Sequence, residues 1–574
     1  MKKGTLTKYV RGYRIQSVLG PLFKLLEALF ELFVPLVVAD IIDVGIADND
    51  MKYIAEHSVI LVVLAFVGLI ASVTAQFFAA RASVGITSEI RHALFEHIGT
   101  FSHEALDKTG SSTLVTRMTS DMNQVQSGLN LTLRLLLRSP FVVFGAIIMA
   151  FRISPSMSLI FIAATIALFA VVFAVMLVCI KLYKKVQTGL DKVTQITRED
   201  LTGARVIRAF CKEQDEIERF DTANNALTQI QMFTGRISAM MNPLTFLIVN
   251  ISIMVLIYRG GLNVESGILT KGEVIALYNY MSQILVELIK LANLSINIAK
   301  SLACAKRISA VLDTDGTMKS GGITEISDSE YAVSFDDVSF TYPDAGDSAI
   351  EHISFSAKKG ETIGIIGATG SGKSSVVNLI PRFYDPTDGT VRIFGQDAAE
   401  YDIDTLRNRI GVVPQKAVLF SGTIRENIKW GNKDASDEDI TRAAEAAQAT
   451  DVIEKKGGLD AVIEAGGADL SGGQRQRLTI ARALVRRPSI LILDDSASAL
   501  DMATDAHLRK AVAGLDFSPT VFIVSQRVSS VKNADRIIVL DDGTMAASGT
   551  HEELLEGCDI YREIYDLQTG GATV

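Results

Sequence analysis

The sequence predicts a multidomain protein: an all-α membrane domain with six spans, followed by an α/β domain that carries a helical subdomain. At 574 residues the chain is too long for one compact core. Hydrophobic residues make up 48% of it and crowd into the first half, which is typical of a membrane domain. The second half holds a glycine-rich loop between an apolar strand and a helix. We therefore expect a membrane domain over residues 1–310, a polar linker over 311–330 and an α/β domain over 331–574.

Six apolar segments in the first half are long enough to cross a bilayer, which needs roughly 20 residues per helix. They are Ile15–Ile42, Ser58–Ala80, Leu133–Phe151, Ser156–Lys181, Pro243–Gly260 and Val274–Ile298. The connections after the first, third and fifth segments are short, and those after the second and fourth are long. This alternation predicts helices that continue well beyond the membrane on one side before the chain turns back.

The distribution of charge orients these spans. Before the first span the charged residues are all basic: Lys2, Lys3, Lys8, Arg11 and Arg14. The short link Asp43–His57 instead carries four acidic residues against Lys52. Because basic residues collect on the cytoplasmic side, the N-terminus is expected there. An even number of spans returns the chain to the same side, so the α/β domain is expected in the cytoplasm.

Charged residues inside two spans have two interpretations. They are Lys24, Glu27 and Glu31 in the first span, and Glu287 and Lys290 in the sixth. Intramembrane charges usually face the bundle interior or water, so they could line a polar cavity whose carboxylates favour cationic or amphipathic substrates. Alternatively, the two lysines neutralise their neighbours, or the residues lie near a membrane face. The sequence leaves both interpretations open.

The glycine-rich loop Gly367–Ser374 reads GATGSGKS and fits the phosphate-binding pattern G-x-x-x-x-G-K-[ST]. It follows the apolar strand ETIGIIG and precedes the helix SSVVNLI, which is the context that the motif requires. Backbone N–H groups and the helix start favour a bound phosphate. Lys373 should reach the β- and γ-phosphates, and Ser374 should hold magnesium. The predicted nucleotide-binding residues are Gly367, Ala368, Thr369, Gly370, Ser371, Gly372, Lys373, Ser374 and Ser375.

Further motifs follow this loop: LSGGQ at Leu470–Gln474, the run ILIL ending in DDSASALD, and VFIVSQR. Together they resemble the nucleotide-binding domain of ATP-binding cassette (ABC) transporters, whose own signature is LSGGQ. The six spans resemble the transmembrane domain of domain-swapped ABC exporters, in which short coupling helices sit on the nucleotide-binding domains. Phe101–Asp121 and Glu199–Phe210 are similar to the flanks of those helices. The resemblance implies a half-transporter that binds ATP and Mg2+.

The resemblance also assigns roles to single residues. Tyr342 would stack on adenine, and Ser374, Gln415 and Asp494 would hold magnesium. Gln415 would also contact the attacking water. Four residues of the signature, Ser471, Gly472, Gly473 and Gln474, would contact ATP bound to a second subunit. The D-loop Ser498–Asp501 would cross to that opposite site, and the helical subdomain should run from about Asp402 to Arg486.

Two catalytic positions depart from the family pattern. Asp495 stands where most members have a catalytic Glu, and Gln526 stands where they have His. The shorter side chain withdraws the carboxylate from the attacking water, and Gln cannot share a proton as His can. The loop before the signature also lacks the usual Glu-Arg pair, for which Glu464 could substitute. Because the nucleotide-holding residues remain, we predict a degenerate site in a heterodimer whose second half-transporter carries Glu and His.

The function expected from the resemblance is ATP-driven export of amphipathic or hydrophobic compounds, of the multidrug type, by a multi-pass protein of the bacterial inner membrane. The expected partners are the second subunit, membrane lipid and a small amphipathic substrate. Alternatives are lipid or peptide export and a nucleotide-gated channel or regulator. The net charge is −9, so the chain lacks the excess of basic residues typical of nucleic-acid-binding proteins, and nucleic acid is not an expected partner.

Overall fold

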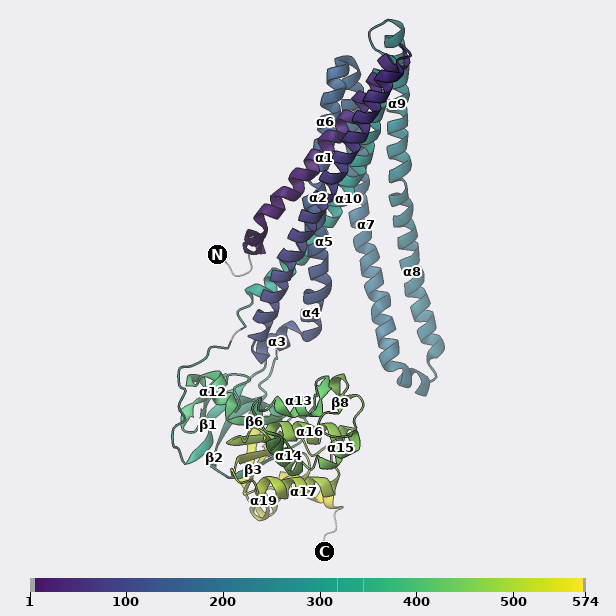
Figure 1. Ribbon diagram of the computed structural model, residues 1–574. Helices are drawn as coiled ribbons and strands as arrows, with labels where there is room; N and C mark the ends of the chain where they lie inside the picture. The colour runs from purple at the N-terminus through teal and green to yellow at the C-terminus, as the bar shows by residue number, and fades with distance from the viewer. Residues whose placement is uncertain (1–5, 317, 344, 571–574) are drawn as a thin grey trace. The chain divides into compact units, whose positions relative to one another are not determined.

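A computed structural model describes residues 6–316, 318–343 and 345–570 (Figure 1). Lys2 and Lys3 of the predicted cytoplasmic segment and Thr317 of the predicted linker lie outside these residues. The chain forms two compact units. One comprises Met1–Gly99 and Ser112–Thr314, and the other comprises Thr100–Ser111 and Asp315–Val574.

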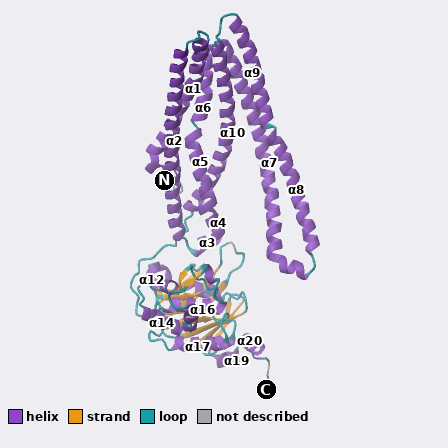
Figure 2. Cartoon of the chain, turned by 45° about the vertical axis from the view of Figure 1, so that its right-hand side comes forward, coloured by secondary structure: helices purple, strands orange, loops and turns teal. Residues whose placement is uncertain are grey.

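The first unit is helical. Its helices are α1 (Arg14–Asp40), α2 (Met51–Gly99), α4 (Ser111–Thr116), α5 (Met122–Leu135), α6 (Arg138–Ile153), α7 (Pro155–Ala209), α8 (Glu213–Ala239), α9 (Met241–Glu265) and α10 (Lys271–Asp313), joined by the short helical segments η1 (Leu6–Tyr13), η2 (Ile41–Ile46) and η3 (Arg117–Asp121). Helix α10 is central, since it packs against α1, α5, α6, α7 and α9. Figures 1 and 2 show α7 and α8 as a hairpin that diverges from the remaining helices.

Five helical stretches of the described residues are long and apolar enough to cross a membrane. They are Met51–Gly99, Ser111–Ile153, Pro155–Ala209, Glu213–Glu265 and Lys271–Asp313, and they contain the predicted second to sixth spans. The predicted first span, Ile15–Ile42, covers most of α1 and the first two residues of η2. It is not among the five because every 18-residue stretch of α1 contains Lys24, Glu27 and Glu31 and is therefore more highly charged than the other stretches. Because α1 still packs against α2, α6 and α10, the helix count agrees with a six-span domain.

Small and apolar side chains allow the central helix to pack closely. Ala276, Leu277 and Ile284 of α10 are fully buried. The hydroxyl of Tyr280, also fully buried, donates a hydrogen bond to the carbonyl of Leu32 in α1 at 2.6 Å. This bond satisfies a polar group that would otherwise be unpaired in an apolar core.

The described residues of the second unit form three β-sheets. An antiparallel sheet has the order β2 (Ile350–Lys358), β1 (Tyr331–Phe340), β4 (Asp388–Ile393), β5 (Gln396–Asp397). A six-stranded sheet has the order β12 (Thr544–Gly549), β11 (Arg536–Asp541), β3 (Thr362–Gly367), β10 (Thr520–Val524), β9 (Ile490–Asp494), β6 (Ile410–Val413), and β7 (Gly422–Thr423) pairs with β8 (Val462–Ile463). All neighbours in the six-stranded sheet are parallel except β11 and β12. Every residue of β9 is buried, as expected for a central parallel strand.

Helices surround these sheets. They are α3 (His103–Thr109), α11 (Lys373–Leu379), α12 (Ile403–Asn408), α13 (Ile424–Lys429), α14 (Asp437–Ala446), α15 (Thr450–Lys456), α16 (Gly472–Leu484), α17 (Met502–Ala513), α18 (Val528–Val531), α19 (His551–Gly557) and α20 (Asp559–Thr569).

The predicted start of the helical subdomain at Asp402 is wrong, because β6 pairs with β9 in the main sheet. Its short run IGVV is apolar, and such runs do not distinguish strand from helix by periodicity.

The predicted coupling segment Phe101–Asp121 is divided, since α3 belongs to the second unit. There the His103 ring stacks on Phe383 with centroids 4.2 Å apart, and the Tyr384 hydroxyl donates to Asp107 at 2.6 Å. Burial, aided by the nearby Arg407 guanidinium, lowers the pKa of His103. The lowered pKa favours the neutral imidazole, which is the form that stacks on the Phe383 ring. The other segment, Glu199–Phe210, is the exposed end of α7 before the turn into α8.

Candidate nucleotide site

A cavity of about 380 Å³ lies where three parallel strands of the second unit end. Val524 of β10 pairs with Ile365 of β3 and Asp494 of β9, so their carboxyl ends meet at one edge of the sheet. Ligands of α/β folds bind at such edges. The cavity is lined by Tyr342, Ser348, Ala349, Thr369, Gly370, Gly372, Lys373, Ser374, Ser375, Gln415, Asp494, Asp495, Val524, Gln526, Asp542 and Gly543.

Most residues predicted for this chain's own site therefore line one cavity, although they come from separate segments. Gly367, Ala368 and Ser371 complete the glycine-rich loop without lining it. Ser348, Ala349, Asp542 and Gly543 were not predicted. The backbone explains their presence, because Glu351 N–H donates to the Gly543 carbonyl at 2.8 Å and joins their two turns beside the loop. No motif in the sequence marks such a contact.

The glycine-rich loop has a conformation that requires glycine. Gly370 and Gly372 both have φ of +87°, in the left-handed region. A Cβ on Gly372 would also lie 2.6 Å from the Ala349 carbonyl oxygen. Lys373 Nζ donates to the carbonyls of Gly367 and Ala368, at 2.9 and 2.5 Å. These two bonds hold the ammonium group over the loop, where it can also donate a hydrogen bond to a phosphate.

The residues predicted to hold magnesium lie together. Ser374 Oγ donates to Asp494 Oδ1 at 3.0 Å, and Gln415 lines the same cavity. Burial raises the pKa of Asp494, as does the neighbouring Asp495 carboxylate, while the Ser374 hydroxyl and Lys373 lower it. Hydroxyl, carboxylate and amide oxygens are the ligands that Mg2+ prefers. The donor set therefore fits magnesium, whose charge would favour the ionised carboxylate.

Lys373 and Tyr342 complete the binding side of the cavity. Burial lowers the pKa of Lys373, while the Asp495 and Asp494 carboxylates raise it. The Tyr342 hydroxyl lies 3.2 Å from Ser375 Oγ, and its ring packs edge-on against Phe340. Tyr342 is thus fixed with its side chain at the cavity, as a residue that stacks on a base must be.

Asp495 and Gln526, the two positions predicted to be catalytic, line the same cavity. Asp495 Oδ2 accepts a hydrogen bond from Gln415 Nε2 at 3.3 Å. The φ of Asp495 is +43°, in the left-handed region that Asp tolerates better than most residues. Gln526 follows β10 and is exposed. The cavity therefore presents a short carboxylate and a neutral amide at these two positions.

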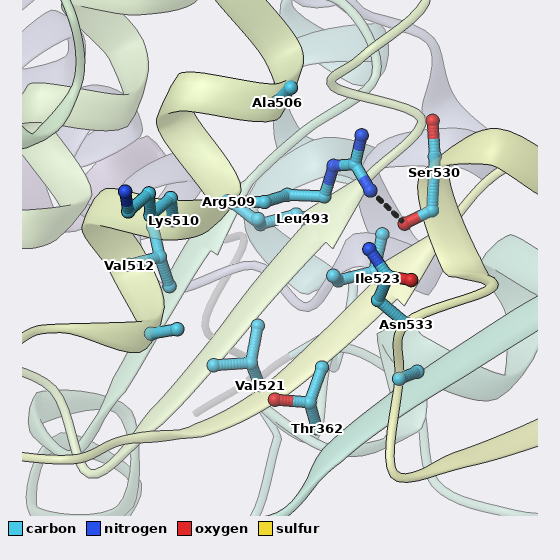
Figure 3. A pocket seen from close by; sticks show the side chains of 12 residues that line it. Thr362, Leu493, Ala506, Arg509, Lys510, Val512, Val521, Ile523, Ser530 and Asn533 are labelled. Atoms are coloured by element: carbon cyan, nitrogen blue, oxygen red, sulfur yellow. Dashed lines mark hydrogen bonds between the residues drawn. The ribbon is translucent and has the colours of Figure 1, made fainter.

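Side chains that were not predicted support the loop that carries Gln526. From α20, Gln568 Oε1 accepts from the Val528 N–H at 2.8 Å, and its Nε2 donates to the Gln526 carbonyl at 2.6 Å. On the other side, Arg509 of α17 donates to the carbonyls of Ser529 and Ser530, beside a second cavity of about 270 Å³ (Figure 3). These contacts bracket the loop between α20 and α17.

The Gln568 contact gives a direct prediction. Gln568→Ala should accelerate amide hydrogen exchange at Val528 roughly fivefold, because one hydrogen bond contributes about 1 kcal/mol to local stability. Gln568→Glu keeps an acceptor oxygen and should preserve protection at Val528. Exchange measured on the two purified full-length variants tests this. Equal protection at Val528 in Gln568→Ala and the unmodified chain would contradict the role of Gln568.

The signature lies outside this chain's own cavity. Ser471 caps α16: its Oγ accepts from the Gln474 N–H at 3.3 Å, and Gln474 Oε1 accepts from the Ser471 N–H at 2.9 Å. A Cβ on Gly473 would lie 2.9 Å from the Ala499 carbonyl, so this glycine allows the signature to contact the D-loop. Ser471 and Gly472 are exposed, as is Glu464. The helix start is therefore accessible to an anion.

Comparison with known proteins supports both halves of this description. Residues 17–288 match the family model described as ABC transporter transmembrane region, and residues 350–498 match the one described as ABC transporter. The uncharacterized ABC transporter ATP-binding protein YfiB of Bacillus subtilis (strain 168) is 35% identical, over 98% of each chain. The ATP-dependent lipid A-core flippase of Vibrio vulnificus (strain YJ016) is 30% identical, over 98% of this chain and 97% of its own. A bacterial Atm1-family ABC exporter with ATP bound has the same fold, with a TM-score of 0.81 and 24% identity over 98% of this chain and 100% of the other.

Proposed function

Because the chain belongs to the ABC transporter family, as an exporter half-transporter with fused transmembrane and ATP-binding domains, we propose that it is one subunit of a heterodimeric exporter. Its own site binds ATP and hydrolyses it slowly. The observation that carries this proposal is that Asp495 and Gln526 line the same cavity as Lys373, Ser374 and Asp494, the residues proposed to hold the nucleotide and magnesium. Two changes at one phosphate, with binding residues retained, favour a site kept for binding.

Within this site each side chain has a separate task. Magnesium, when bound, neutralises phosphate charge and orients the phosphates; Ser374, Asp494 and Gln415 would hold it. When ATP binds, Lys373 donates a hydrogen bond to a phosphate oxygen in place of one of the loop carbonyls. The short Asp495 side chain, which contacts Gln415, leaves the attacking water poorly oriented. Gln526 offers the γ-phosphate a hydrogen bond without a mobile proton.

The same chain contributes to a second, active site. In ABC dimers the signature of one subunit completes the nucleotide site of the other. Here the exposed Ser471 and Gly472 present the start of α16 to the partner's ATP, and Ser498–Asp501 crosses towards it. The partner should carry Glu and His at the positions of Asp495 and Gln526. Hydrolysis at the partner's site then drives transport.

The test compares ATP turnover by this chain alone with turnover by the pair that it forms with a second half-transporter that carries Glu and His at the two positions. We expect the pair to be at least tenfold faster. Lys373→Ala should leave most of the pair's turnover, whereas the matching lysine substitution in the partner should abolish it. Rapid hydrolysis by this chain alone, or equal loss from either lysine substitution, would contradict the proposed asymmetry.

The proposed substrate is an amphipathic compound that leaves the cytoplasm or the inner leaflet, as in multidrug export. A membrane lipid is the second candidate, favoured by full-length relatives named lipid A-core flippases. The chain is a multi-pass membrane protein. We assign it to the bacterial inner membrane with its ATP-binding domain in the cytoplasm, because the segment before α1 is basic.

A further inference from the structure

The helical unit contains a cavity of about 370 Å³ between α1, α6 and α10. One part of its wall is apolar and is formed by Val34, Pro35, Val142 and Val286. The other part is polar and includes Glu31 of α1 and Lys290 of α10. A cavity that is apolar on one side and charged on the other fits an amphiphile.

An arginine that the sequence analysis missed connects the charged residues. Arg138, at the start of α6, pairs with Glu31 at 2.6 Å and also with Glu287. Lys290 Nζ lies 2.8 Å from Glu287 Oε1. The charges thus form the series Glu31, Arg138, Glu287, Lys290, which alternates in sign from α1 to α10. A second ion pair, Lys24–Glu27 at 2.5 Å, lies beside it.

Both interpretations of the intramembrane charges describe part of this network. The lysines do neutralise their neighbours, since Lys24, Arg138 and Lys290 balance Glu27, Glu31 and Glu287. Three of the six residues, Glu31, Glu287 and Lys290, nevertheless line the cavity. With Arg138 included, the network gives the cavity no net negative charge, so the expected preference for cations loses its basis.

The two ends of the series differ from its middle in exposure. The side chains of Arg138 and Glu287 are only 7% and 4% exposed, whereas those of Glu31 and Lys290 are 42% and 41% exposed. The inner pair is therefore largely buried, although Glu287 borders the cavity, and the two ends are open. One end offers a carboxylate and the other offers an ammonium group.

Two buried polar atoms, one of them at the cavity, have unused hydrogen-bonding capacity. Gln283, which lines it, has a buried Oε1 with no hydrogen-bond partner among the described residues. Arg138 Nε is buried and likewise unpaired within the described part of the chain. An unsatisfied buried polar atom costs about 1–3 kcal/mol, so a polar ligand group beside Gln283 would remove a penalty.

We propose that this cavity binds the zwitterionic head group of an amphiphile. The ligand's ammonium group contacts Glu31, and its phosphate or carboxylate contacts Lys290. Its apolar tail lies along Val34, Val142 and Val286. Because the network is balanced, a ligand that carries both signs leaves no net charge inside the apolar bundle, whereas a purely cationic or anionic one does. This inference rests on the proposed export of amphipathic compounds and names their class.

The test measures binding of three amphiphiles with equal tails to the full-length chain in nanodiscs: dodecylphosphocholine, dodecyltrimethylammonium and dodecyl phosphate. The zwitterion should bind most tightly. Glu31→Gln should weaken binding of the zwitterion and the cation about tenfold and leave the anion unchanged. Lys290→Met should weaken binding of the zwitterion and the anion and leave the cation unchanged. Both variants keep the inner Arg138–Glu287 pair, and their melting temperatures check folding.

A matched control comes from an exposed ion pair of α2, Lys52–Glu56, whose side chains are 86% and 62% exposed. Lys52→Met and Glu56→Gln should change none of the three affinities. Equal affinity for the three amphiphiles, or Glu31 and Lys290 variants that bind like the unmodified chain, would overturn the proposal. The assay does not use ATP, so failure here leaves the comparison of ATP turnover between chain and pair untouched.

Nanodisc composition separates two sources of the same head group. In phosphatidylcholine nanodiscs a lipid ligand would compete with dodecylphosphocholine, and the apparent affinity would fall relative to phosphatidylglycerol nanodiscs. Equal affinity in both lipids assigns the cavity to a free amphiphile taken from the cytoplasm.

Discussion

Asp495→Glu is expected to raise ATP turnover by this chain alone, by up to on the order of a hundredfold. The added methylene extends the carboxylate by roughly 1.5 Å, one carbon–carbon bond length. At present Asp495 Oδ2 contacts Gln415 Nε2 at 3.3 Å. The longer acid would move its carboxylate from this contact towards the cavity, where the attacking water is expected. A displacement of about 1 Å is sufficient for a hundredfold effect on rate.

Steady-state phosphate release from the purified chain in nanodiscs measures this gain. Asp495→Asn removes the charge without changing the length and should show no gain. Combining Asp495→Glu with Lys373→Ala should abolish the increase, since the reaction then loses its phosphate contact. The double substitution Asp495→Glu with Gln526→His should exceed the single one, because an imidazole can share a proton. Unchanged turnover in the Asp495→Glu chain would show that the short acid is not what limits hydrolysis.

The sequence predicts the nucleotide site well because each part of it follows a local pattern. The glycine-rich loop joins an apolar strand to a helix, and Asp494 ends a continuously apolar strand. Parallel strands then bring such ends to one edge of the sheet. The local patterns therefore predicted that Lys373, Asp494 and Gln526 belong to one site, and all three line the same cavity.

Residues whose role depends on a distant partner could not be predicted in this way. Arg138 contacts Glu287, 149 positions away, and Gln568 contacts the loop at Gln526, 42 positions away. Neither contact has a periodicity or motif, because it depends on how whole helices pack. Arg138 lies inside the predicted third span, so the rule for intramembrane charges could have marked the residue itself, but the sequence does not indicate its partners.

Arg138→Met is expected to destabilise the helical unit by about 3–5 kcal/mol, the effect of removing one partner from a buried ion pair. Glu287 would remain as a carboxylate with a side chain only 4% exposed, supported by Lys290 and by the Ser139 hydroxyl at 2.7 Å. Glu31 would lose the Arg138 cation that lies 2.6 Å from it. Since the free energy of unfolding of a whole domain is roughly 5–15 kcal/mol, this loss would remove a large part of the stability of the helical unit. The melting temperature and the monodisperse fraction on size exclusion measure the loss.

Removing the charges together should reverse this effect. The quadruple variant Arg138→Met, Glu31→Gln, Glu287→Met, Lys290→Met removes the whole series and leaves no unpaired charge at the cavity, and replacing whole buried ion pairs by apolar groups is often neutral or stabilising. It should therefore melt at or above the temperature of the unmodified chain, while its preference for dodecylphosphocholine disappears. The charges would then be shown to determine head-group selectivity without being needed for the stability of the fold. If Arg138→Met alone melted like the unmodified chain, the buried pair would contribute nothing to the fold, and the charges would be free to serve binding alone.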